Sequence, residues 1–323
     1  MSIHLTRWKP PVAVSKNNRP PKVAVARATW LPLSPMNRII LTAVFLFASA
    51  GLAAAQLLPP HKDKLFAYPD VLSVADDGDY RVIDYNEMRD INGRDQTPER
   101  RVQGKYVSTG IRRDQHDLVA ETSAGKVRHI AVGTSRRASV IVVYLHGQGG
   151  SRRQGADDFT FGGNFNRIKN LVNSARGLYL SPDFSDFDDK GAAEIKALLS
   201  IYLRASPEAE VVFACGSMGG ALCWRFARDP DIAPRLGGLM LLGSLWDSDF
   251  ASSAAFRLRV PVFLGHGSRD SVFPIDKMEA FYRSVRKAAS GYPIRMVRFE
   301  TGSHGTPIRM TDWRETINWM LAQ

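Results

Sequence analysis

The stretch EVVFACGSMGGALCWRFAR, residues 210–228, contains the pattern that decides the fold. Residues 211–214 are apolar and mostly β-type, which is typical of a strand buried on both faces. Residues 217–228 carry apolar side chains four positions apart, which predicts a helix. The chain must turn between the two within a few residues, and the small residues around Ser217 permit such a turn. The pattern therefore predicts Ser217 at the tip of the strand, in a strained backbone conformation.

Ser217 is the residue of this turn whose side chain could take part in a reaction. A helix N-terminus presents free N–H groups and a dipole that favour an anion, and an exposed serine there has the setting of a nucleophile elbow. Glycine-rich turns also bind phosphates, and some are only structural. The spacing of Gly216, Gly219 and Gly220 does not fit GxGxxG, and no Lys-Ser or Lys-Thr pair follows. The motif favours a nucleophilic serine, with a structural turn as the main alternative.

The positive charge of the chain is concentrated at its N-terminus. The 323 residues have a formal net charge of +11, but residues 1–55 hold seven of the 43 basic residues and none of the 32 acidic ones. The remainder therefore carries 36 basic against 32 acidic residues, an ordinary balance that gives no support to nucleic-acid binding. The length of the chain suits one α/β domain of roughly 200–250 residues.

Residues 1–55 are predicted to be an export segment. Met36-Asn-Arg is a basic start, residues 39–52 are a nearly unbroken apolar run, and small residues precede Gln56. These are the three parts of a secretory signal, so we predict translation from Met36, cleavage after Ala55, and a periplasmic or secreted protein. The alternative is an uncleaved anchor, in which residues 39–58 would span a bilayer and the domain would still face outward. Only in that case is a membrane expected as a partner.

The two cysteines, Cys215 and Cys223, lie in the elbow stretch. A bridge would require a strand end and a helix interior to approach within about 7 Å at their Cα atoms, which we do not expect. The sequence instead predicts two buried thiols that pack as small apolar side chains. No cluster of Cys and His has zinc-binding spacing, so no metal is predicted.

Apolar, β-branched runs alternate with helical patterns in the C-terminal two thirds of the chain. The alternation predicts an α/β fold with a doubly wound, mostly parallel central sheet flanked by helices. A hairpin of strands 117–122 and 126–132 precedes it. The further strands are expected at 139–145, 177–181, 211–214, 238–245, 260–264 and 294–299, and the helices at 164–172, 192–203, 217–228, 275–289 and 310–321. Residues 56–115 show no sustained period and are expected to form an N-terminal arm on the domain, with a short strand at 80–85.

Three loops are expected beside the elbow, because function collects at the C-terminal ends of parallel strands. Residues 146–150 (HGQGG) follow one strand, and their glycines let backbone N–H groups approach a ligand. Asp270 follows a second strand and His304 the last one. Taken singly, Asp270 is typical of a turn and His304 of a solvated loop. Together they supply what a serine nucleophile needs, a base and an acid that fixes the base's tautomer.

On these residues, the chain from about residue 117 to 323 resembles the α/β-hydrolase-fold serine hydrolases, whose triad follows the order Ser, Asp, His. The resemblance implies that Ser217 is the nucleophile, Asp270 the acid and His304 the base. Asp276 is a second candidate for the acid, but it opens a helix and fits N-capping better. The domain division that follows is 1–55, 56–115 and a catalytic domain at 116–323.

The same resemblance implies an oxyanion hole made by the backbone N–H groups of Met218 and Gln148, with no organic cofactor and no metal. His146, Gly147 and Trp246 are candidates for contacts with substrate. One departure from the family pattern is Cys215, which stands where the elbow prefers glycine. Cysteine is also small, so the elbow assignment is retained.

The connection at residues 246–258, where related proteins insert a lid, is short and rich in small or polar residues. We therefore expect no large cap domain and an open site suited to small soluble esters. Trp246 and Phe250 are candidates for an acyl pocket or for packing. The sequence predicts an exported carboxylic ester hydrolase, with thioesterase or peptidase as enzyme alternatives. A non-catalytic binding module of the same fold is the alternative from another class.

Overall fold

The structure is a computed structural model that describes residues 57–96 and 100–323. The predicted export segment, with its start at Met36 and its cleavage site after Ala55, lies outside these residues. Within the described ranges, no helix combines the length and the apolar character needed to cross a bilayer.

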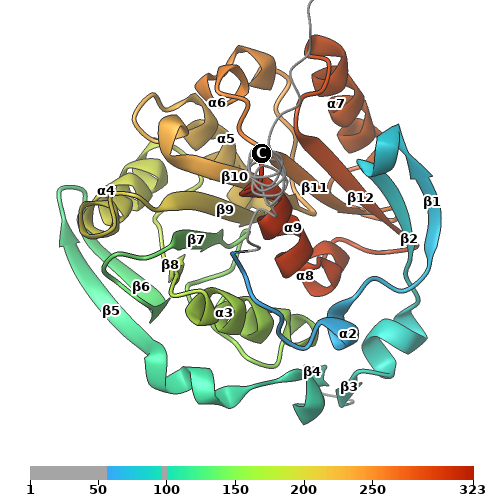
Figure 1. The fold of residues 1–323 in the computed structure, drawn as a ribbon, viewed down its shortest axis with the longest axis horizontal. Coiled ribbons are helices and arrows are strands. Elements are labelled where there is room, and N and C mark those ends of the chain that lie inside the picture. Colours follow the sequence, from blue (N-terminus) through green and yellow to red (C-terminus); the bar gives the residue numbers. More distant parts are fainter. Residues whose placement is uncertain (1–56, 97–99) are drawn as a thin grey trace, which may run out of the picture. The chain divides into compact units, whose positions relative to one another are not determined.

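Most strands of the described residues belong to one sheet of ten (Figure 1). The strands are β1 (Val71–Ala75), β2 (Tyr80–Asp84), β3 (Asp95–Gln96), β4 (Arg101–Val102), β5 (Gln115–Thr122), β6 (Gly125–Gly133), β7 (Val140–Leu145), β8 (Leu178–Pro182), β9 (Glu210–Gly216), β10 (Leu236–Leu242), β11 (Val262–Gly267) and β12 (Ile294–Glu300). The order in the large sheet is β1-β2-β12-β11-β10-β9-β7-β8-β6-β5, while β3 and β4 pair separately. Pairing is parallel from β2 across to β8 and antiparallel at the two edges.

Helices cover both faces of this sheet (Figure 1). They are α2 (Asp63–Phe66), α3 (Asn164–Ser174), α4 (Asp189–Ala205), α5 (Gly220–Arg228), α6 (Ala254–Arg257), α7 (Ile275–Ala288), α8 (Thr306–Met310) and α9 (Trp313–Met320). Apolar side chains of α4, α5, α6 and α7 form a core on one face, and those of α3, α8 and α9 form a core on the other. Successive strand residues alternate between these cores, as a strand's period of two requires.

Strand β9 shows this alternation at the centre of the sheet. Val211, Phe213 and Cys215 belong to the core beneath α4 and α5, whereas Val212 and Ala214 belong to the opposite core. All are buried, which confirms the prediction of a strand covered on both faces. The alternation also directs Cys215 toward the side of the sheet that α5 covers.

The predicted doubly wound arrangement is confirmed, and the predicted strands and helices occur with shifted ends. One helix prediction was wrong: residues 310–321 are not one helix but the end of α8 followed by α9. The break occurs because the Asp312 side chain accepts hydrogen bonds from the N–H groups of Arg314 and Glu315 and so starts a new helix. Residues 246–258 contain only short helical segments, in agreement with the absence of a cap domain among the described residues.

The N-terminal arm is more integrated than the sequence suggested. The predicted strand at 80–85 exists as β2, but it pairs in parallel with β12 and, with β1, extends the main sheet. Its irregular part is joined to the domain by a buried ion pair, in which Arg309 of α8 donates to both carboxylate oxygens of Asp95 at 3.0 and 2.5 Å. Because the two residues of this ion pair are charged and far apart in the sequence, hydrophobic periodicity does not reveal their contact.

Candidate active site

Ser217 occupies the turn between β9 and α5. A 3-10 turn, Ser217–Gly219, connects the two elements, and Ser217 has a φ of 50°. This left-handed conformation is unfavourable for a residue with a Cβ, costing on the order of 1–3 kcal/mol, so the surrounding structure must impose it. The strained conformation predicted for Ser217 is confirmed.

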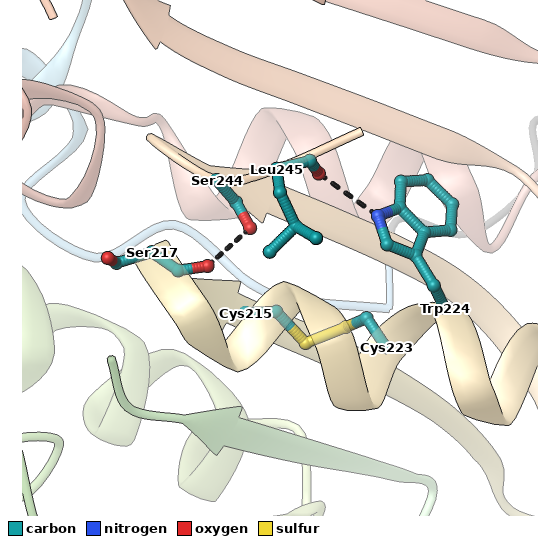
Figure 2. The surroundings of a disulfide bond; sticks show 6 residues. All are labelled: Cys215, Ser217, Cys223, Trp224, Ser244 and Leu245. Carbon is teal, nitrogen blue, oxygen red and sulfur yellow. Dashed lines mark hydrogen bonds between the residues drawn. A yellow bond between two sulfur atoms is a disulfide. The ribbon is translucent and has the colours of Figure 1, made fainter. Parts of the chain in front are cut away.

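Two glycines allow the neighbouring strand ends to pack against this turn. A Cβ at Gly219 would collide with the carbonyl oxygen of Leu145, and one at Gly220 would collide with the Oγ of Ser244. The same Oγ donates a 2.6 Å hydrogen bond to the carbonyl oxygen of Ser217, as Figure 2 shows. The ends of β7 and β10 therefore hold the backbone of Ser217 from outside the turn.

The structure brings the three predicted strand ends together at Ser217. The His304 Nε2 lies 2.9 Å from the Ser217 Oγ, and its Nδ1 lies 2.8 Å from the Asp270 Oδ2. With Nδ1–H donating to the carboxylate, Nε2 is left free to accept the serine proton. The His304 side chain is 29% exposed and that of Asp270 is fully buried. Solvent and substrate can thus reach the base, while the acid is protected.

The carboxylate of Asp270 is held in its ionised form. Burial alone would raise the pKa of Asp270, but the hydrogen bond from His304 and the N–H groups of Phe273 and Val272 outweigh it. These two N–H groups donate to Oδ1 at 3.0 and 2.8 Å. The net effect is a pKa lowered from the ordinary value of 3.8, so Asp270 is charged at neutral pH.

His266 is a neighbour of the triad that sequence reasoning missed. Its side chain is fully buried, and its Nε2 lies 2.7 Å from the Phe273 carbonyl oxygen and 3.4 Å from the Asp270 Oδ2. Its Nδ1 is buried with no hydrogen-bond partner among the described residues. Burial lowers the pKa of His266, more than its contacts with Phe273 and Asp270 raise it. The His266 ring is therefore neutral, and in this form it supports the loop that carries Asp270.

The predicted oxyanion loop passes directly beside the serine. A Cβ added to Gly147 would lie 2.7 Å from the Cβ of Ser217, so only glycine fits there. Gln148 follows and is exposed, and Met218 is half-buried next to the serine. His146 is only 6% exposed, and its ring stacks on Phe184 at 4.2 Å between centroids. Its Nδ1 also lies 2.8 Å from the Gly147 carbonyl oxygen, so His146 packs against the loop and its ring has little surface left for contact with substrate.

The other substrate candidates separate into two environments. Trp246 is half-buried and lines a cavity of about 690 Å³ that also contacts Phe187, Ala221 and Leu245. Phe250 is fully buried and packs against Trp224 and other rings, so the packing role proposed for it is the one observed.

Asp276 lies in the first turn of α7 and is exposed. Its side chain caps no backbone group, so the N-capping expected for it was wrong; it lies where a negative charge still favours the helix dipole. Asp270, not Asp276, contacts His304.

The prediction of two free thiols was also wrong. Cys215 and Cys223 form a disulfide with a Cα–Cα distance of 6.4 Å (Figure 2). The helix α5 starts only at Gly220, so Cys223 lies one turn into it rather than two, above the face of β9 to which Cys215 points. The alternation of β9 and the return of the helix over that face bring the sulfurs together. Among the described residues, no group of three or more His, Cys, Asp or Glu is placed to hold a metal ion.

No protein-family model matches the chain, and no curated protein sequence matches it either. Solved structures do match. A protein of unknown function from Agrobacterium tumefaciens, described as an alpha/beta hydrolase, is 14% identical with a TM-score of 0.51, over 64% of this chain and 95% of its own. A thermostable esterase is 16% identical with a TM-score of 0.52, over 66% of this chain and 64% of its own. Together with the strand order and the elbow, these likenesses establish that the chain adopts the α/β-hydrolase fold.

Proposed function

We propose that this protein is a serine hydrolase that cleaves carboxylic esters of small molecules through an acyl-enzyme intermediate. The observation that carries the proposal is the chain of hydrogen bonds from Ser217 through His304 to the buried Asp270, built on a strained elbow. A serine that only shapes a turn needs neither an aligned base nor a buried acid.

In the proposed mechanism, His304 Nε2 takes the proton of Ser217 as Oγ attacks the substrate carbonyl. Asp270 fixes the tautomer of His304 and stabilises the imidazolium that forms. The N–H groups of Met218 and Gln148 would stabilise the oxyanion, a contribution of about 3–4 kcal/mol per donor in comparable sites. The proton then passes from His304 to the leaving alcohol, and water releases the acid by the same route.

The open surroundings of the site favour small soluble esters. The short connection after β10 leaves no cap domain over Ser217 among the described residues. Thioesters and peptides would use the same residues, so thioesterase and peptidase activities remain the enzyme alternatives. A binding module that has lost catalysis is the alternative of another class.

We further infer that the catalytic domain works in an oxidising compartment outside the cytosol. The signal-like residues 36–55 support this proposal, and so does the disulfide, since such bonds persist mainly in exported proteins.

Hydrolysis of p-nitrophenyl esters from acetate to palmitate, with Ser217→Ala in parallel, tests the proposal. We expect the variant to fold and to lose at least about 10⁴-fold in kcat. Equal activity in the two proteins would refute the site. A serine-reactive fluorophosphonate separates enzyme from binding module, because a binding module should not be labelled. Peptide and thioester substrates, assayed alongside, identify the preferred acyl bond.

A further inference from the structure

The disulfide between Cys215 and Cys223 encloses the candidate nucleophile. Cys215 precedes Ser217 by two residues in β9, and Cys223 follows it by six residues in α5. The loop that the bond closes therefore contains Ser217 and Met218, the proposed nucleophile and a proposed oxyanion donor. Figure 2 shows the bond linking the two arms of the elbow, close to Ser217.

The disulfide is built into the core rather than exposed as a switch. Both cysteines are 0% exposed and belong to the core cluster beneath α5. A reductant cannot reach the sulfurs without opening this core. The bond thus has the placement of a permanent brace in the folded protein.

The disulfide closes a short loop, so its effect on the geometry of the elbow should matter more than its effect on the stability of the whole fold. Disulfides that restrict the unfolded chain stabilise more as the enclosed loop lengthens, and here the sequence separation is only eight. What the bond restrains is the elbow itself, where Ser217 keeps a φ of 50°. The Ser244 hydrogen bond and the packing at Gly219 and Gly220 hold this turn from outside, whereas the disulfide joins its two ends from within.

The brace also accounts for the unusual residue before the nucleophile. Position 215 is where the elbow pattern prefers glycine, and a side chain there must fit between strand and helix. Cys215 points toward α5, and its sulfur is bonded there to Cys223. Cys215, the residue that departs from the elbow pattern, is therefore the one that links β9 to α5.

We propose that Cys215 and Cys223 are positioning residues for catalysis: their disulfide holds the Ser217 Oγ and the Met218 N–H in the arrangement that attack requires. This inference rests on the proposed function of Ser217. It predicts that the bond affects the rate of attack by serine, beyond its effect on folding.

The test uses the full chain and first counts its thiols. Because both sulfurs are buried, alkylation is done in denaturant and followed by mass spectrometry; it should find no free thiol without reductant and two after reduction. The double variant Cys215→Ala/Cys223→Ala then removes the bond. Val211→Ala is the matched control, because Val211 is a fully buried residue on the same strand and the same face, at the end away from the elbow.

Three quantities are compared at a temperature at which circular dichroism shows every variant folded: kcat, KM and the second-order rate constant of fluorophosphonate labelling. We expect the double variant to lose at least about tenfold in kcat and in labelling, because small misplacements of reacting groups are costly. KM should stay within about twofold, as for loss of an interaction made only in the transition state. Val211→Ala should lower the melting temperature while its labelling rate stays within about twofold of wild type.

Labelling of the folded double variant within about twofold of wild type would overturn the inference, and so would two free thiols in the denatured protein before reduction. If the double variant does not fold, the near-isosteric Cys223→Ser, which also breaks the bond, gives the same comparison. A wild type that does not react with the probe would instead overturn the proposed function, and this inference with it.

Discussion

Ser244 and Ser217 are joined by a 2.6 Å hydrogen bond from a side-chain Oγ to a backbone carbonyl oxygen. Ser244 is fully buried just beyond the end of β10, and Ser217 follows the end of the adjacent β9. The bond ties the backbone of the candidate nucleophile to the neighbouring strand end. A strained elbow is stable only when its surroundings impose its geometry, and this contact is one of them.

Ser244→Ala should therefore weaken both the fold and catalysis. The part-buried carbonyl oxygen of Ser217 loses its side-chain donor and keeps a backbone N–H donor within the turn, so the variant should lose about 0.5–1.5 kcal/mol of unfolding free energy, and kcat should fall several-fold as the elbow relaxes. Urea unfolding and ester hydrolysis measure the two effects. Ser206→Ala is the control, because the Ser206 Oγ is equally buried and bonded to one backbone group, the N–H of Ala138, at the far end of β7. A kcat loss as large in Ser206→Ala would show that the effect of Ser244 is not local.

Gly147→Ala should impair the oxyanion loop. The new Cβ would lie 2.7 Å from the Cβ of Ser217, so the loop that carries the Gln148 N–H must move. Loss of one oxyanion donor lowers kcat by about 10²–10³-fold, and a partial displacement should approach that range. Gly104→Ala serves as the control, since a Cβ there meets nothing within 4 Å. Activity of Gly147→Ala within about twofold of wild type would remove Gly147 and Gln148 from the oxyanion hole.

Asp270→Asn should lower kcat by about 10⁴-fold, because the amide no longer fixes the reactive tautomer of His304. The variant should also be less stable at neutral pH. The pKa of Asp270 is lowered in the folded protein, so its carboxylate stabilises the fold above its ordinary pKa of 3.8, and this contribution is lost as the pH falls through the lowered value. The difference in unfolding free energy between wild type and variant should therefore shrink in acid. Urea titrations at several pH values test this, and a difference that grows in acid would contradict it.

The sequence predicted those features that depend on local pattern and on parallel-sheet geometry. Ser217, Asp270 and His304 follow three strands, and parallel strands bring their ends to one edge whatever the details of packing. The disulfide was missed because its formation depends on how closely α5 returns over β9, a tertiary distance that neither Cys215 nor Cys223 reveals in sequence. His266 was missed for a similar reason: a histidine inside an apolar strand is indistinguishable from packing until the Asp270 loop is folded against it. The ion pair of Asp95 with Arg309 joins residues far apart in the chain, beyond the reach of any periodicity.

That ion pair should be essential for attaching the N-terminal arm. The side chains of Asp95 and Arg309 are 0% and 8% exposed, and Arg309 lies in α8, shortly after His304. Asp95→Ala leaves a buried guanidinium without its carboxylate, which costs about 3–5 kcal/mol of unfolding free energy. The exposed pair Lys126–Glu121 gives the contrast: Glu121→Ala should change stability by less than about 1 kcal/mol. Similar urea midpoints for the two variants would show that the arm is held by other contacts.

His266 should make the stability of the fold sensitive to mild acid. Burial lowers the pKa of His266 below its ordinary value of 6.5, so between the two values the unfolded chain binds a proton that the folded protein does not. Stability is therefore complete above the ordinary pKa and falls as the pH drops below it. His266→Gln keeps an N–H donor for the Phe273 carbonyl oxygen but removes the titrating group. Its unfolding free energy should fall less than that of wild type between about pH 7.5 and pH 5.5, whereas His116→Gln, at an exposed position, should follow wild type. Identical pH slopes for wild type and His266→Gln would mean that the ring is protonated without cost in the folded protein, and that its place beside Asp270 has no electrostatic consequence.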